Sequence, residues 1–367
     1  MARADTAPST LEEKPGRRSI DNDNWALVTA GSRRRASLAA VRALAAAGYR
    51  AAVTVSGPSL AASSRYCDRT VEVPPVTDAG YAPAVRAELE RNSYVAVYPA
   101  SDPALLALDG PGTHLMDKLT LAELARGAEL EMPPSQLFDT PEDLLAAGDS
   151  LQYPVVVKPN IRRYFPRRVD SPSGLAAVVG RTGPVLVQPY LHDALCEVSG
   201  VMWGGRLVAA SHHRCLRVWP VDCGTVTAAE TVAPDAELEA RLEKLLEGYS
   251  GVFQAQLMGP YLLDVNPMVH TSMPLALAGG VNLVGVHCDL VRGIDVTPVR
   301  ARPGEFYRWL EGDWRSIVAA FRKRRNSATQ TARALMPRRG AVHSTESVRD
   351  PGPLLARVWY GGALGRL

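Results

Sequence analysis

The sequence lacks any apolar run of about 18 residues, the length that a helix needs to span a bilayer. The best candidate, residues 273–286, is interrupted by Pro274, Asn282 and three glycines. The first 24 residues are polar and charged and contain no apolar stretch of the kind found in secretory signals. We therefore expect a cytoplasmic protein without a membrane partner, with residues 1–23 as a disordered leader.

Cysteine is scarce and scattered. An odd number of five, with no C-x-x-C pair, excludes a disulfide framework and a structural zinc site, and predicts free thiols. The formal net charge of +3 is small for 367 residues, so composition does not indicate a nucleic-acid binder. With 46% hydrophobic and 22% charged residues, the chain is an ordinary globular one of about two to three domains.

Short apolar strands alternate with helices in the first hundred residues. Strands are predicted at 25–30, 51–56 and 94–98, and helices at 36–47 and 82–91. This alternation is typical of a parallel α/β sheet. The turn after the first strand lacks the G-x-G-x-x-G pattern, which argues against a dinucleotide site.

A second region combines strands with chemistry-bearing side chains. Asp264 and Asn266 alternate on one strand and therefore share a face, and Gln254 and Gln256 alternate on the preceding strand of a predicted hairpin. Carboxylate and amide oxygens on one face suit a hard cation such as Mg2+. The same residues also suit the turn that ends a strand, so this motif alone leaves both interpretations open.

Two lysines favour the metal interpretation. Lys118 begins a helix after Asp117, and Lys158 ends the strand predicted at 153–158. A lysine at a strand end beside a metal is suited to holding nucleotide phosphates, although each lysine alone could be a solvated surface residue. The metal interpretation rests mainly on the order of these motifs along the chain. They are an α/β half, a D-K helix, a V-V-V-K-P strand, a V-Q-P-Y-L strand and a Q-x-Q hairpin with D-x-N-P.

That order resembles the ATP-grasp superfamily, in its carboxylate–amine ligase and carbamoyl-phosphate-synthetase-like branch, over about residues 24–295. The resemblance implies an α/β protein with the ATP-grasp fold: an N-terminal parallel α/β (pre-ATP-grasp) domain, two α+β subdomains and a basic, partly helical C-terminal extension. The implied boundaries are 24–112 for the first domain, 113–300 for the ATP-grasp domain with a small lid at about 150–190, and 301–367 for the extension.

The resemblance also implies site residues and cofactors. ATP would be bound through the phosphate-contacting Lys118 and Lys158, the adenine hinge Gln188, Pro189, Tyr190 and Leu191, and the ribose-binding Glu197. Mg2+, with Mn2+ as an alternative, would be held by Gln256, Asp264 and Asn266. The catalytic group would comprise Lys158, Asn266 and Arg214, the last holding the electrophilic carboxylate.

Two positions depart from the family pattern. Met268 stands where the family pattern N-P-R has an arginine that steadies the transferred phosphate. The segment after Lys158, usually glycine-rich, instead contains Arg162, Arg163, Arg167 and Arg168. These arginines could bind phosphate or carboxylate, or form a solvated basic loop. 

The sequence gives weaker evidence for a functional role of the histidines near these motifs. His212 and His213 are adjacent on a strand and face opposite ways, so at most one of them can join a site. His270 and Ser272 follow the metal strand and are candidates for lining the acceptor pocket.

The implied function is an ATP-dependent ligase. It would activate a carboxylate as an acyl phosphate and join it to an amine such as an amino acid or peptide, releasing ADP and phosphate. The alternatives are an enzyme that phosphorylates bicarbonate or another acid, and a catalytically impaired nucleotide-binding protein. Many members of the family are dimers, so a homodimer would fit.

The tail from residue 301 holds thirteen Lys and Arg against five Asp and Glu. It is either a nucleic-acid contact or a docked accessory element. The apolar residues Leu310, Ile317 and Phe321 of a predicted helix at 309–324 favour docking, and nucleic acid is not the expected partner.

Overall fold

The computed structural model describes residues 24–29, 35–161, 165–178 and 183–361. Its N-terminal part is a sheet in the order β3-β2-β1-β4, and its parallel pairing confirms the predicted parallel sheet. The strands are β1 (Trp25–Thr29), β2 (Arg50–Val55), β3 (Arg69–Glu72) and β4 (Ala96–Pro99). Strand β3 was not predicted. It is a short edge strand whose residues are alternately half-buried and exposed, and it contains no apolar run.

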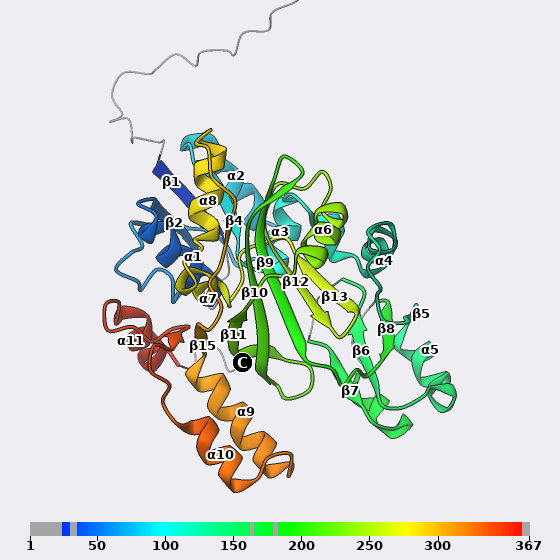
Figure 1. Cartoon of the computed structure of the whole chain (residues 1–367). Helices are drawn as coiled ribbons and strands as arrows, with labels where there is room; N and C mark the ends of the chain where they lie inside the picture. The colour runs from blue at the N-terminus through cyan, green and yellow to red at the C-terminus, as the bar shows by residue number, and fades with distance from the viewer. Residues whose placement is uncertain (1–23, 30–34, 162–164, 179–182, 362–367) are drawn as a thin grey trace, which may run out of the picture.

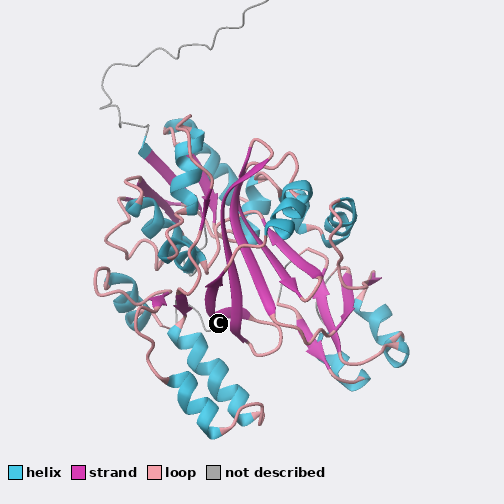
Figure 2. Cartoon of the chain, in the orientation of Figure 1, coloured by secondary structure: helices cyan, strands magenta, loops and turns pink. Residues whose placement is uncertain are grey.

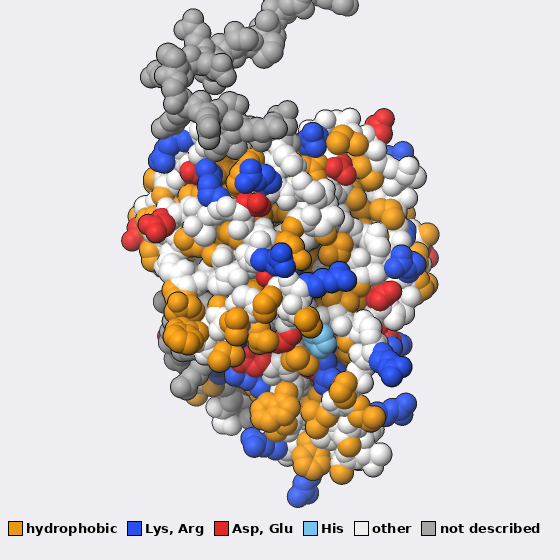
Figure 3. Space-filling view, turned by 90° about the vertical axis from the view of Figure 1, so that its left-hand side faces the viewer, with side chains coloured by type: hydrophobic (Ala, Val, Ile, Leu, Met, Phe, Trp, Pro, Cys, Tyr) orange, Lys and Arg blue, Asp and Glu red, His pale blue; other side chains and the backbone are white. Residues whose placement is uncertain are grey.

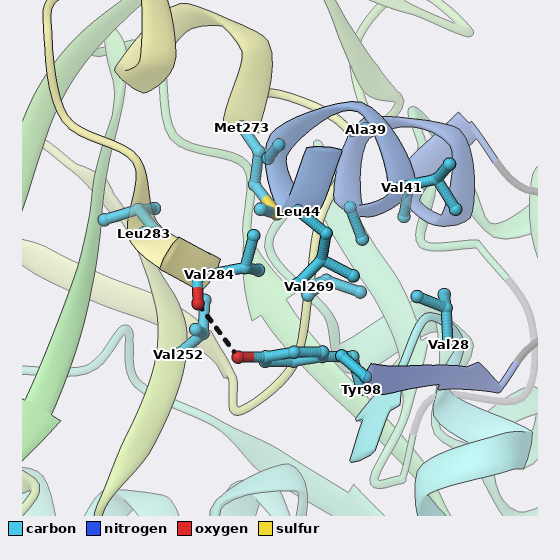
Figure 4. Packing of buried hydrophobic residues seen from close by; sticks show 14 of the residues in the cluster. Val28, Ala39, Val41, Leu44, Tyr98, Val252, Val269, Met273, Leu283 and Val284 are labelled. Carbon is cyan, nitrogen blue, oxygen red and sulfur yellow. Dashed lines mark hydrogen bonds between the residues drawn. The ribbon is translucent and has the colours of Figure 1, made fainter. Parts of the chain in front are cut away.

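Helix α1 (Arg35–Ala46) connects this sheet to the rest of the chain. Its alanine-rich face packs on α7 (Met273–Ala278) and α8 (Leu283–Val291), which lie more than 200 residues further along the sequence. Figure 4 shows the shared core, in which the Tyr98 hydroxyl donates a hydrogen bond of 3.1 Å to the carbonyl of Val284. This packing fixes the carboxyl end of the parallel sheet against the second half of the molecule.

The central sheet runs in the order β13-β12-β9-β10-β11-β15-β16, with β14 paired to β10 (Figure 1). Its strands are β9 (Leu195–Trp203), β10 (Arg206–Trp219), β11 (Thr225–Val232), β12 (Gly251–Met258), β13 (Tyr261–Asn266), β14 (Val299–Arg300), β15 (Phe306–Arg308) and β16 (Val342–His343). The hairpin predicted to carry Gln256 and Asp264 is confirmed as β12–β13. Gly204 and Gly205, at φ 56° and 78°, supply the left-handed pair that a two-residue hairpin turn requires.

A third, antiparallel sheet has the order β5-β8-β6-β7 and its own core around Leu144, Val157 and Leu175. Its strands are β5 (Gln136–Phe138), β6 (Val155–Pro159), β7 (Arg167–Val169) and β8 (Val185–Pro189). Helix α5 (Pro141–Ala146) lies beside it (Figure 2) and begins after the N-cap Thr140, whose side chain accepts a hydrogen bond from the backbone of Asp143. The range of 150–190 proposed for a lid therefore leaves out β5, which pairs with β8.

The remaining helices cover these sheets and form the C-terminal part. They are α2 (Tyr81–Arg91), α3 (Asp102–Leu108), α4 (Lys118–Gly127), α6 (Ala236–Leu245), α9 (Leu310–Arg322), α10 (Ala328–Leu335) and α11 (Gly352–Trp359), with short 3-10 turns at Thr113–Met116, Gly148–Ser150 and Pro172–Val178. Within the described ranges, every helix is too short or too polar to cross a bilayer. All five cysteines are free thiols, as predicted.

The C-terminal extension docks on the central sheet through β15, β16 and α9. The predicted apolar face of α9 is wrong in part, because Ile317 is fully buried whereas Leu310 and Phe321 are 38% and 48% exposed. The buried face instead contains Asp313, which accepts hydrogen bonds from Arg217 and Arg308, both at 2.6 Å. Figure 3 shows Lys and Arg scattered among hydrophobic side chains on one face of the molecule, without a continuous basic surface there.

We expect Asp313→Asn to lower the free energy of unfolding by about 3 kcal/mol, because it leaves Arg308 and Arg217 without their buried counter-charge. Glu237→Gln, which removes an exposed ion pair to Arg241 on α6, serves as the control and should change stability little. Urea denaturation followed by circular dichroism measures both. Equal effects of the two substitutions would contradict the structural role given to Asp313.

Candidate functional site

A cavity of about 790 Å3 lies where the three sheets meet. Residues 100–103 line it from the end of the parallel sheet, and residues 188–191 line it from the small sheet. The central sheet contributes polar side chains of β9, β12 and β13, and the segment after α9 contributes Arg325. The cavity is thus bounded by elements from every part of the described chain.

Polar side chains form a row across four strands of the central sheet. Strand pairing places Gln256 opposite Asp264 on one side and opposite Glu197 on the other, and Glu197 opposite His213. This register confirms the predicted placement of Gln256 beside Asp264. A second row, one pleat repeat away, contains Asn266, Gln254, Ser199 and Ser211.

Lys118 and Lys158 are both buried, at 5% and 7% exposure, and both line this cavity, so neither is a solvated surface lysine. The ammonium of Lys118 lies 2.6 Å from Asp264 Oδ1, and that of Lys158 lies 3.4 Å from the carbonyl oxygen of Leu263. Asn160, just after β6, holds the two lysine-bearing elements together. Its Nδ2 donates to Asp117 Oδ2 at 2.6 Å and its Oδ1 accepts from the Lys118 backbone at 3.1 Å.

The environment of Lys158 disfavours its charge. Burial, followed by repulsion from Lys118, lowers the pKa of Lys158 to about 8, and attraction to Asp264 opposes this only in part. The folded protein therefore keeps a cation in a desolvated position where an anionic ligand would stabilise it.

The donor set around Asp264 fits a hard divalent cation. Asp264 supplies a carboxylate, and Gln256 and Asn266 supply amide oxygens whose own amide nitrogens donate elsewhere, to Glu197 at 2.8 Å and to Gln254 at 3.2 Å. Oxygen donors of these kinds are the usual Mg2+ ligands. Among the described residues, no cluster of three or more His, Cys, Asp and Glu side chains could hold a metal, so a site here depends on the amides.

Glu197 lines the cavity but its carboxylate is already bonded. Gln256 donates to Oε1 at 2.8 Å and Ser272 donates to Oε2 at 2.9 Å. Burial by itself raises the pKa of Glu197, yet His213 and Gln256 outweigh it and hold that pKa below its usual value, so the carboxylate is ionised. Its assignment to ribose stays a prediction.

The histidines separate as their alternation predicts. His212 faces away from the cavity row and contacts Glu239 at 2.9 Å, whereas His213 and His270 contact Ser211 and Ser199 at 2.7 and 2.8 Å. Burial lowers the pKa of His270 to about 4, which leaves a neutral imidazole on the cavity wall. 

Ser272 was expected to line the acceptor pocket, and this prediction is wrong. Its side chain is buried between Glu197 and Gln254 and does not line the cavity.

The predicted hinge, residues 188–191, lines the cavity in full. Gln188 is buried and donates to Ser135 Oγ at 2.7 Å, and Tyr190 donates its hydroxyl to Asp222 at 3.1 Å. The guanidinium of Arg168 stacks 4.2 Å from the Tyr190 ring centre. Adenine binding by this segment stays a prediction.

Arg214, expected to hold a carboxylate, is not brought to the cavity. Its side chain is 56% exposed and pairs with Glu230 on the outer face. A register irregularity of β10 between Cys215 and Arg217 follows, and Arg217 lines the cavity instead. Arg217 was not among the predicted site residues, because no local sequence pattern indicates this irregularity.

The basic segment after β6 is described only in part. Arg162 and Arg163 lie outside the described residues. Arg168 pairs with Asp170 at 2.7 Å and lies 3.6 Å from Asp222, and the exposed Arg167 does not line the cavity. Met268 lines it but packs in a small core with Leu105 and Met116.

No protein-family model matches the sequence, nor does any curated protein. Solved structures match at low identity. L-amino acid ligase from Bacillus licheniformis has a TM-score of 0.56 at 15% identity, over 78% of this chain and 79% of that chain. N5-carboxyaminoimidazole synthetase from Staphylococcus aureus, complexed with ADP, has a TM-score of 0.60 at 12% identity, over 78% and 82%. Biotin carboxylase from Campylobacter jejuni has a TM-score of 0.57 at 15% identity, over 77% and 74%.

We expect Lys158→Met to stabilise the protein at pH 7, by up to about 3 kcal/mol, because it removes a charge from a desolvated position. Between the folded pKa of about 8 and the ordinary 10.5, the unfolded wild-type chain binds more protons than the folded one, so wild-type stability rises with pH and the advantage of the variant shrinks. Urea denaturation at pH 7 and pH 9.5 tests this, with the exposed Lys244→Met as control. A gain that is equal at both pH values would contradict it.

Proposed function

We propose, proceeding from the ATP-grasp fold that this chain shares with its structural neighbours, that it is an ATP-dependent ligase. It would activate a small carboxylic acid as an acyl phosphate and join it to an amine. The observation that carries this proposal is the convergence of two buried lysines and the Gln256–Asp264–Asn266 oxygens in one cavity. The acid and the amine would be small molecules such as amino acids or peptides, used in the cytoplasm.

In the first step, an oxygen of the substrate carboxylate attacks the γ-phosphorus of ATP, and the bond from that phosphorus to the oxygen of the departing ADP breaks. Negative charge rises on the phosphoryl oxygens during the transfer. Lys158 and Lys118 would neutralise it, and their buried positions strengthen the attraction because little water screens it.

A Mg2+ ion would be held by Asp264 with the amide oxygens of Gln256 and Asn266, and would supply further charge neutralisation to the phosphates. The ammonium of Lys118, now 2.6 Å from Asp264, would then turn toward the nucleotide. Lys118 therefore neutralises Asp264 in the free protein and contributes to phosphate binding in the complex.

In the second step, the amine nitrogen attacks the acyl carbon, the bond from that carbon to the phosphate oxygen breaks, and the departing phosphate takes up the proton that the amine loses. The ionised Glu197 lines the same cavity, as does the neutral imidazole of His270. Water must be excluded, since it would hydrolyse the acyl phosphate. The small sheet, which carries residues 188–191, forms the wall of the cavity on that side.

A second candidate is phosphorylation of bicarbonate or another acid without an amine. The structural similarity to biotin carboxylase supports this candidate as much as the similarity to L-amino acid ligase supports the first one.

A third candidate is a catalytically impaired nucleotide-binding protein. The observation that favours it is the hydrophobic setting of Met268, which leaves no cation at that position.

ADP release measured with a coupled assay separates these functions. We expect turnover only when ATP, Mg2+, an acid and an amine are all present, across a panel of amino acid pairs. Turnover with bicarbonate alone would favour the second candidate, and nucleotide binding without turnover would favour the impaired protein.

Lys158→Ala should lower ADP release by about 100-fold or more, because one of the phosphate-neutralising cations is lost. Lys244→Ala, which removes an exposed lysine paired with Glu129, should retain wild-type activity. Circular dichroism checks that both variants fold. Retained turnover in a well-folded Lys158→Ala protein would defeat the proposal.

A further inference from the structure

Three cations converge on one carboxylate of the cavity wall, where the segment after α9 meets the β10–β11 loop. Asp222 in this loop contacts Arg325 Nη1, and its Oδ2 lies 3.3 Å from Lys323 Nζ. Arg168 Nη1, from the small sheet, lies 3.6 Å from its Oδ1, to which Tyr190 also donates at 3.1 Å. One carboxylate thus connects the C-terminal extension, the hinge segment and the small sheet.

This cluster has more positive than negative charge. Within the described residues, Arg168, Lys323 and Arg325 share Asp222, and the second carboxylate present is Asp170, which pairs with Arg168 at 2.7 Å. Burial would raise the pKa of Asp222, but the contacts from Arg325 and Lys323 outweigh it and keep the group ionised. A surplus cation on a cavity wall attracts an anionic ligand.

The cluster and the two buried lysines share one cavity. Cys223 follows Asp222 directly, and both residues line it. Lys158 and Arg325 line that same cavity. An anion held by Lys158 would therefore lie in the cavity that Arg325 also lines.

The end of α9 aims Arg325 at the cavity. Arg324 adopts a left-handed conformation at φ 54°, and its backbone N–H bonds to Phe321 while that of Arg325 bonds to Ala320, both at 2.9 Å. These two bonds form the Schellman termination of a helix. Because Asp313 fixes α9 to the central sheet, Arg325 is presented from an anchored element.

We propose that Arg325 is a ligand-binding residue supplied by the C-terminal extension, and that it binds a phosphate oxygen of the nucleotide. This inference rests on the proposed function. A guanidinium has five N–H donors, and in the described chain only Nη1 of Arg325 has a protein partner, Asp222. Asp222 holds that nitrogen, and the 39% exposed side chain of Arg325 lines the cavity, so its other donors can reach a ligand bound there.

Calorimetric titration of the whole protein with ATP, ADP and adenosine in the presence of Mg2+ tests this. Arg325→Ala should weaken ATP binding about tenfold, as expected for one charge-assisted hydrogen bond, and leave adenosine binding unchanged. Arg325→Lys should restore part of the loss. Arg322→Ala, which removes an equal charge from an exposed position three residues earlier, is the matched control and should bind like the wild type.

Each other outcome overturns the inference in a distinct way. Equal weakening of ATP and adenosine would show that Arg325 only supports the structure. Unchanged nucleotide binding with a raised KM for the acid would assign the anion to the acid substrate. A wild-type protein that binds neither ATP nor ADP would defeat the proposed function itself, whereas wild-type binding that Arg325→Ala leaves intact would defeat this inference alone.

Discussion

The ion pair between Lys118 and Asp264 connects the elements that define the cavity. Lys118 begins α4, Asp264 lies on β13, and Asn160 ties the start of α4 to the end of β6. A buried ion pair contributes little net stability, because desolvation offsets most of the attraction. Together with the destabilising charge on Lys158, it concentrates buried charge of both signs along one cavity at little gain in stability.

The polar rows of the central sheet surround the carboxylates of the cavity with hydrogen-bonding side chains. Strand pairing places Gln256 between Asp264 and Glu197, so its amide lies between the two strands that carry these carboxylates. Both oxygens of Glu197 accept hydrogen bonds, and the imidazole of His270 stays neutral. The sheet thereby keeps two carboxylates on the cavity wall, of which Asp264 is paired with Lys118.

The C-terminal extension is part of this architecture. Strands β15 and β16 extend the central sheet. Asp313 of α9 accepts a hydrogen bond from Arg217 of β10, and Arg217 lines the cavity. Arg325 reaches the same cavity from the end of α9. Sequence patterns indicated a docked element, but they assigned Leu310 and Phe321 to its buried face, because a hydrophobic periodicity cannot show that an ion pair occupies the contact.

The sequence by itself determined the features that depend on near neighbours. Alternation placed Gln254 and Gln256 on one face, a proline and a threonine began α5, and the order of strands and lysines indicated the fold. Tertiary structure alone decided that Arg217 and not Arg214 lines the cavity, and that Asp222 meets Arg325, 103 residues away. The physical reason is that periodicity is a local property of the backbone, whereas the partner of a charged side chain depends on how distant elements pack.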